Sequence, residues 1–116
     1  EILIDKVFLN NVNVKFIINN SPLTKYHVLI CPNLEACLPQ IMTLDCLELA
    51  LNIMHSSNDK SIRIGYNSPG ALASVNQLHI HLLSIEKDLY VEHVVSDFEN
   101  FKEYRLPNLI IENSIF

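Results

Sequence analysis

Cysteine is scarce in this sequence of 116 residues, and the three cysteines present do not form a pattern typical of a disulfide framework or a zinc site. Cys31, Cys37 and Cys46 are odd in number, and none of their spacings gives a CxxC motif. The sequence therefore predicts neither a disulfide-linked domain nor a zinc knuckle. Unpaired cysteines are typical of a reducing compartment, so we expect a cytoplasmic protein.

Basic residues and long apolar runs are also few. Eight Lys and Arg residues stand against thirteen Asp and Glu residues, which gives a formal net charge of −5. Proteins that coat nucleic-acid polymers carry basic patches instead. No apolar run approaches the roughly 20 residues of a membrane span. We therefore expect neither a nucleic-acid polymer nor a membrane among the partners, although a single nucleotide needs only local hydrogen-bond donors.

The first residues, EILIDKV, include no initiator methionine and lack the basic, apolar and small-residue regions of a signal peptide. We therefore expect a trimmed or incomplete sequence rather than a targeted one. With 49% hydrophobic residues, the chain is long enough for one domain with a real core, and no linker marks a second domain. The predicted organisation is a single domain over residues 1–116, as a piece of a longer chain.

Hydrophobic periodicity predicts several strands and one helix. Alternation of apolar and polar residues predicts a strand over 12–18, and a β-rich run predicts another over 26–30. Residues 1–9 are expected to form an edge strand or a connector, and further strands are expected at 89–95, which contains His93, and at 109–111. The order of strands and helix predicts the α+β class, with an antiparallel sheet and one main helix packed on it.

The helix is predicted between Pro39 and Ser56, with Thr43 as its N-cap. Its polar face carries acidic and amide residues together with His55. Its apolar stripe, expected to face the core, consists of Ile41, Leu44, Leu47, Leu51 and Met54.

The stretch 62–83 is predicted to form an antiparallel hairpin with one apolar and one polar face. Successive side chains of a strand alternate between its two faces, and the nine residues 68–76 are expected to connect the two strands. The expected apolar face carries Ile62, Ile64, Tyr66, Leu78, Ile80 and Leu82, and the polar face carries Arg63, Gly65, Asn67, Gln77, His79 and His81.

The polar face of this hairpin has a composition suited to a phosphate ester. It would bring two imidazoles, two amides and one guanidinium to a single cleft, and Gly65 would leave room beneath a ligand. The connecting loop contains small residues, among them Gly70 and Ser74, whose backbone N–H groups could approach phosphate oxygens closely. We therefore expect Asn67, Gly70, Ser74 and Arg63 to bind the phosphates of a nucleotide.

The run NSPGALASVNQLHIHLL, residues 67–83, resembles the active-site strand of the histidine-triad (HIT) superfamily, whose signature is His-x-His-x-His followed by two apolar residues. Its flanks GYN and SPGALASVN resemble the GDP-hexose phosphorylase branch, whose members act on GDP-D-glucose or GDP-L-galactose. The segment INNSPLTKYHVLICP, residues 18–32, resembles a strand-turn-strand of the same branch. The resemblance, which covers residues 12–83, implies a HIT-like fold and a nucleotidyltransferase without a cofactor, acting on a nucleotide sugar and inorganic phosphate.

The resemblance also implies roles for three residues of the motif. His79 would carry a covalent guanylyl intermediate, and its other ring nitrogen would need an acceptor, often a backbone carbonyl, to fix the reactive tautomer. His81 would stabilise phosphate charge or orient the ligand. Gln77 stands where the superfamily usually has its first histidine, and its amide can donate a hydrogen bond but cannot titrate. His27 resembles the histidine of a Gly-His-x-Leu element, although Tyr26 replaces the glycine, so a packing role is equally consistent.

Two alternatives remain at this point. His79, His81 and Glu86 match part of the cupin metal motif, although Glu86 lies an odd number of residues from His81 and so on the opposite face of a regular strand. The chain could also be a HIT-like domain that binds nucleotide or another partner without catalysis, because Gln77 replaces a histidine. The sequence does not decide whether phosphate or water accepts the nucleotide, or which base and sugar are bound. It also leaves open a homodimer, which many histidine-triad proteins form.

Overall fold

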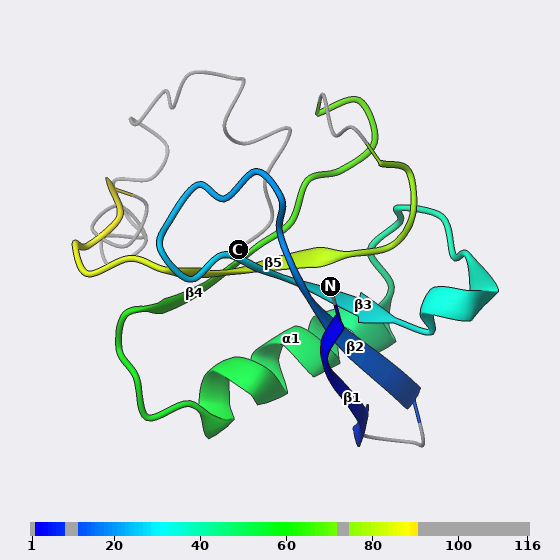
Figure 1. Ribbon diagram of the computed structural model, residues 1–116, viewed down its shortest axis with the longest axis horizontal. Helices are drawn as coiled ribbons and strands as arrows, with labels where there is room; N and C mark the ends of the chain where they lie inside the picture. Colours follow the sequence, from blue (N-terminus) through cyan, green and yellow to red (C-terminus); the bar gives the residue numbers. More distant parts are fainter. Residues whose placement is uncertain (1, 9–11, 72–74, 91–116) are drawn as a thin grey trace, which may run out of the picture.

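The structure, a computed structural model, describes residues 2–8, 12–71 and 75–90 (Figure 1). Five strands form one antiparallel sheet in the order β1-β2-β3-β5-β4. The strands are β1 (Ile2–Phe8), β2 (Val12–Ile18), β3 (Val28–Pro32), β4 (Ile62–Gly65) and β5 (Ile80–Ser84), and between β3 and β4 lie the 3-10 helix η1 (Leu34–Ala36) and the α-helix α1 (Leu44–Ser56). The predicted α+β class is confirmed.

The predicted strands agree with the structure to within a few residues. β2 has the predicted bounds, β3 begins two residues later than predicted, and β1 pairs only with β2 and is therefore an edge strand. The strand predicted at 109–111 lies outside the described residues. Of the strand predicted at 89–95, Leu89 and Tyr90 are described and are not in a strand, and the rest, His93 included, lies outside the described residues. Within the part of the chain that the structure describes, neither helix is long and apolar enough to cross a membrane.

Helix α1 forms where it was predicted, but it buries a different stripe. Its cap is confirmed, because the Cys46 N–H donates to Thr43 Oγ1 at 3.2 Å. The buried side chains are Cys46, Leu49 and Ala50, whereas Leu44 is 78% exposed. The buried stripe combines the small side chains of Cys46 and Ala50 with Leu49, whereas the predicted stripe consisted of large apolar residues alone. Of the predicted stripe, Ile41, Leu44, Leu51 and Met54 are exposed, and Leu47 is half-buried.

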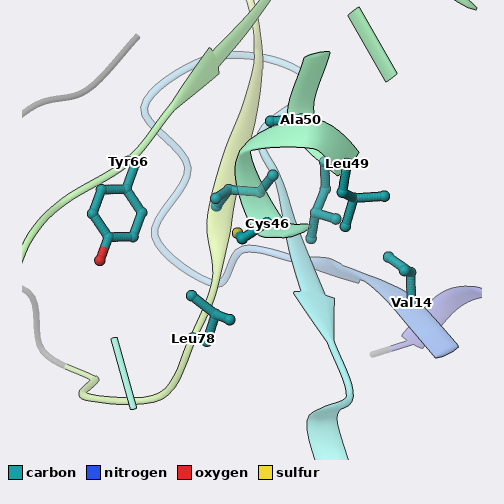
Figure 2. Close-up of a cluster of buried hydrophobic side chains, with 8 residues drawn as sticks. Val14, Cys46, Leu49, Ala50, Tyr66 and Leu78 are labelled. Atoms are coloured by element: carbon teal, nitrogen blue, oxygen red, sulfur yellow. The ribbon is translucent and has the colours of Figure 1, made fainter. Parts of the chain in front are cut away.

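The core lies between α1 and one face of the sheet. Figure 2 shows Cys46, Leu49 and Ala50 on the helix, with Val14 and Leu78 among their neighbours. The cluster consists of Val14, Ile30, Cys46, Leu49, Ala50, Tyr66, Leu78 and Ile80. Because the side chains of a strand alternate, the residues between these core positions must face the opposite side of the sheet. Figure 1 shows α1 on one side and the β2–β3 and β4–β5 connections on the other.

The predicted hairpin is confirmed as an antiparallel pair of β4 and β5, although β5 also pairs with β3 on its other edge. The pairings of Ile17 with Leu29, Leu29 with His81, and His81 with Gly65 place these four residues in one row across the sheet. This row lies on the face away from α1. The connection is longer than the nine residues predicted, because β4 ends at Gly65 and β5 begins at Ile80.

Candidate functional site

A cleft of about 560 Å³ lies over the face of the sheet that α1 leaves uncovered. Its volume falls within the roughly 300–1,000 Å³ of small-molecule sites. The β2–β3 turn, η1 and the end of the β4–β5 connection form its walls. Its described lining residues are Ile17, Ile18, Asn19, Asn20, Ser21, Leu23, His27, Leu29, Cys31, Leu34, Asn67, Val75, Gln77, Leu78, His79 and His81. The structure therefore brings together Asn67, Gln77, His79 and His81 of the predicted site.

His79 lies just before β5 and has a defined tautomer. Its Nδ1 is 2.6 Å from the backbone oxygen of Gln77. A carbonyl oxygen only accepts hydrogen bonds, so Nδ1 carries the proton and the neutral ring has its lone pair on Nε2. This is a backbone carbonyl acceptor of the kind that the sequence analysis expected for His79. His79 is 8% exposed, so its ring is held in a largely buried position at the edge of the cleft.

The tautomer of His81 follows from a short chain of hydrogen bonds. The Leu23 backbone N–H donates to His27 Nδ1 at 2.9 Å, so the proton of a neutral His27 must lie on Nε2. His27 Nε2 is 2.8 Å from His81 Nδ1 and therefore donates to it. His81 Nδ1 is thus an acceptor, and the proton of His81 lies on Nε2. The backbone of the β2–β3 turn determines, through His27, that His81 offers one N–H donor.

Burial keeps this histidine pair uncharged at neutral pH. Desolvation, with smaller contributions from the nearby His79 and His27, lowers the pKa of His81 to about 4. Desolvation also lowers the pKa of His27. A protonated His81 would also turn its Nδ1 into a second donor facing the His27 Nε2–H. At pH 7, His81 is therefore a neutral hydrogen-bond donor and not a fixed positive charge.

Gln77 lines the cleft and also holds one of its walls. Its Nε2 donates to the backbone oxygen of Leu34 in η1 at 2.7 Å. One of its two amide hydrogens is thus engaged within the protein, and the side chain is held at the edge of the cleft. Asn67, the other predicted amide, lines the cleft next to the end of β4.

Two of the remaining predicted phosphate-binding residues, Arg63 and Gly70, are not among the described lining residues of the cleft. The Arg63 guanidinium donates to the backbone oxygens of Lys60 and Ile62, at the far end of β4. Gly70 is exposed in a turn, where its φ of 87° and the bond from the Ala71 N–H to the Ser68 oxygen fit a type II turn with glycine at its third position. Ser74 lies outside the described residues.

The metal-site alternative has little support from this geometry. Glu86 is exposed, follows the end of β5 and is not among the described lining residues of the cleft. Among the residues that the structure describes, no group of three or more His, Cys, Asp or Glu side chains could hold a metal ion.

His27 is the residue whose place in the site the sequence analysis did not assign. It is 4% exposed and contacts His81, 54 residues away in sequence, from the position directly before β3. The signal in the sequence was a histidine directly before an apolar strand, within a segment that already resembled the phosphorylases. Its role depends on the pairing of β3 with β5, which a local pattern does not predict.

Comparison with known proteins finds a family match over the part of the chain that contains the cleft. A family described as "GDPGP1-like, N-terminal domain" matches residues 3–83. The chain belongs to this family. GDP-D-glucose phosphorylase 1 of Xenopus laevis is 43% identical over 76 residues, which are 66% of the chain and 19% of that protein. No solved structure matches the chain.

Two further relatives also match most of the chain. GDP-D-glucose phosphorylase 1 of Danio rerio is 37% identical over 93 residues, 80% of the chain and 25% of that protein. GDP-L-galactose phosphorylase 2 of Arabidopsis thaliana is 37% identical over 79 residues, 68% of the chain and 18% of that protein. The chain thus spans a quarter or less of each of these family members.

Proposed function

We propose that this family member is a nucleotidyltransferase of the GDP-hexose phosphorylase type, which converts GDP-D-glucose and inorganic phosphate to GDP and glucose 1-phosphate. The names of its relatives support the substrate class. The observation that carries the mechanism is the Nδ1–H of His79 bonded to the Gln77 carbonyl, because it leaves Nε2 as the nucleophilic nitrogen. An antiparallel sheet with one main helix, and a His-x-His motif that leads into the inner strand β5, support a HIT-like fold.

In the first step, His79 Nε2 attacks the α-phosphorus of GDP-glucose. A nitrogen–phosphorus bond forms, the bond from the α-phosphorus to the bridging oxygen breaks, and that oxygen leaves with the electron pair as glucose 1-phosphate. Positive charge develops on the imidazole, and the Nδ1–H bond to the Gln77 carbonyl becomes stronger as it does so. The second pKa of a phosphate monoester is near 6, so the leaving group departs without a proton at neutral pH.

Neutral donors around the phosphorus would stabilise the transition state. The Nε2–H of His81 and the amide of Asn67 are suited to the non-bridging oxygens, and the second amide hydrogen of Gln77 is suited to the bridging oxygen. Gln77 needs no titrating group for this role. Apolar side chains of the cleft, Ile17, Leu29 and Leu34, offer a surface for the flat base.

In the second step, an oxygen of inorganic phosphate attacks the same phosphorus. The phosphorus–oxygen bond of GDP forms, the nitrogen–phosphorus bond breaks, and the electron pair returns to His79 Nε2. We further propose that the 116 residues form one domain of a longer enzyme, since the matching family is an N-terminal domain. The three free cysteines favour a cytoplasmic location, and a homodimer stays a prediction.

Trapping the intermediate tests this mechanism. The full-length protein, incubated with GDP-glucose in the absence of phosphate, should form a guanylyl adduct that is labile in acid and stable in base, as a phosphorus–nitrogen bond is. His79→Ala should abolish the adduct and leave the fold intact. His55→Ala, on the exposed face of α1, is the matched control and should form the adduct at the wild-type yield.

Two results would contradict the proposal. An adduct at full yield in His79→Ala would place the covalent bond on another residue. A wild-type protein whose melting temperature rises with GDP-glucose, but which forms no adduct and releases no glucose 1-phosphate, would be a nucleotide-binding domain and not a transferase.

A further inference from the structure

Gln40, a buried glutamine between η1 and α1, makes three side-chain hydrogen bonds around His79. Its Oε1 accepts from the His79 backbone N–H at 2.8 Å. Its Nε2 donates to the backbone oxygens of His79 and Asn67, each at 3.0 Å. Gln40 is 1% exposed. Its backbone oxygen accepts a hydrogen bond from the hydroxyl of the buried Tyr66 at 2.9 Å. The sequence analysis found no signal for this residue.

These bonds replace a missing piece of the sheet. The paired register of β4 and β5 ends with Gly65 and His81, and Asn67 and His79 each lie two residues beyond that last pair. The regular ladder stops before Asn67 and His79, because β4 ends at Gly65 and β5 begins at Ile80. The Gln40 amide bridges the two positions and serves both the N–H and the C=O of His79, as a neighbouring strand would.

The geometry points to Gln40 as the positioning residue for His79, a role whose catalytic consequence rests on the proposed function. The hydrogen bond from His79 Nδ1 to the Gln77 oxygen spans only two residues of backbone. It keeps its geometry only while the backbone at His79 is fixed, and Gln40 fixes both backbone groups of that residue. Gln40 thereby maintains the Nδ1–H tautomer and the position of Nε2.

An amide is the one uncharged side-chain group that accepts and donates twice in one plane. Methionine has a similar length and fills the same volume, but it leaves the His79 N–H and both carbonyls without these bonds. Glutamate keeps the acceptor, and it donates one bond when protonated and none when ionised. The substitutions Gln40→Met and Gln40→Glu therefore separate the hydrogen bonds from the packing.

The test uses the full-length protein and a control of matched stability. Leu49→Ala removes core volume on α1 without contacting His79 and provides a variant with a lowered melting temperature. We expect Gln40→Met to slow formation of the guanylyl adduct on the order of 100-fold, with KM for GDP-glucose changed less than about threefold. Leu49→Ala should keep the wild-type rate at temperatures below its melting transition.

The glutamate variant adds a pH dependence that packing alone does not produce. A buried carboxyl group has a raised pKa, so Gln40→Glu should be protonated at mildly acidic pH. Its adduct rate, divided by that of Gln40→Met at the same pH, should be high in acid and approach one as the pH rises. A ratio that does not change with pH would overturn the assigned role.

The tautomer itself gives a readout that does not depend on activity. The ¹⁵N shifts of the His79 ring should show a protonated Nδ1 in the wild type and in Leu49→Ala, and a mixture of tautomers in Gln40→Met. If Gln40→Met keeps both the tautomer and the adduct rate of Leu49→Ala, the proposal is refuted while the transferase function stands. If the tautomer shifts but the wild type forms no adduct, the positioning role stands and the proposed function fails.

Discussion

The burial of His81, beside His79 and His27, predicts that acid destabilises the folded protein. The folded-state pKa of His81 is lowered from the ordinary 6.5 to about 4. Between these two values the unfolded chain binds a proton that the folded protein does not bind. The contribution of His81 to stability is therefore complete above about pH 6.5 and is lost as the pH falls toward 4.

The size of this effect follows from the same shift. One pKa unit corresponds to about 1.4 kcal/mol of unfolding free energy, so the shift of His81 corresponds to about 3 kcal/mol at most. Because part of the ring is accessible to solvent, we expect a loss of about 2 kcal/mol. The lowered pKa of His27 adds a loss in the same direction. Such a loss is a large part of the stability of a small domain.

Urea unfolding curves at several pH values measure the effect. His81→Gln removes the titrating ring and keeps an oxygen that can accept from the His27 Nε2–H. Between pH 7 and about pH 4, we expect the wild type to lose about 2 kcal/mol more than this variant. The control His55→Gln should lose as much as the wild type. Parallel curves for the wild type and His81→Gln would refute the reasoning.

Two further predictions concern the motif and the helix. Gln77→His restores the superfamily pattern but removes the hydrogen bond to the Leu34 oxygen. Because the phosphate leaving group needs no proton, we expect a guanylylation assay to show no gain in turnover. A clear gain would show that proton delivery limits the reaction. Leu49→Ala should lower the free energy of unfolding in urea by about 2–4 kcal/mol. Leu44→Ala, at a 78% exposed position, should lower it by less than about 0.5 kcal/mol. Equal losses would contradict the observed buried stripe.

Alternation along a strand was enough to predict the two faces of the central hairpin. Leu78 and Ile80 are buried in the core, and His79 and His81 line the cleft, because the period of a strand leaves little choice once one face is apolar. The expected carbonyl acceptor for His79 is also local, since it belongs to Gln77. These parts of the site depend on residues that are close in sequence.

The helix and the partner of His81 could not be predicted in the same way. Helix α1 carries apolar residues on two overlapping stripes, and periodicity does not say which stripe meets the sheet. The stripe that enters the core is the one that contains Cys46, Leu49 and Ala50. The position of His27 beside His81 depends on the pairing of β3 with β5 across most of the chain.

The place of β5 in the sheet has a consequence for how the protein folds. Among the strands that the structure describes, β5 is the last in sequence, yet it lies between β3 and β4. The chain must close a loop of about 50 residues before β3 and β5 pair, and such non-local pairing is slow to form. β1, β2, β3 and α1 are all synthesised before the strand that carries His81. The row that contains His81 and the five-stranded sheet therefore form together, and any opening that releases β5 disrupts the cleft and detaches β4 from the rest of the sheet.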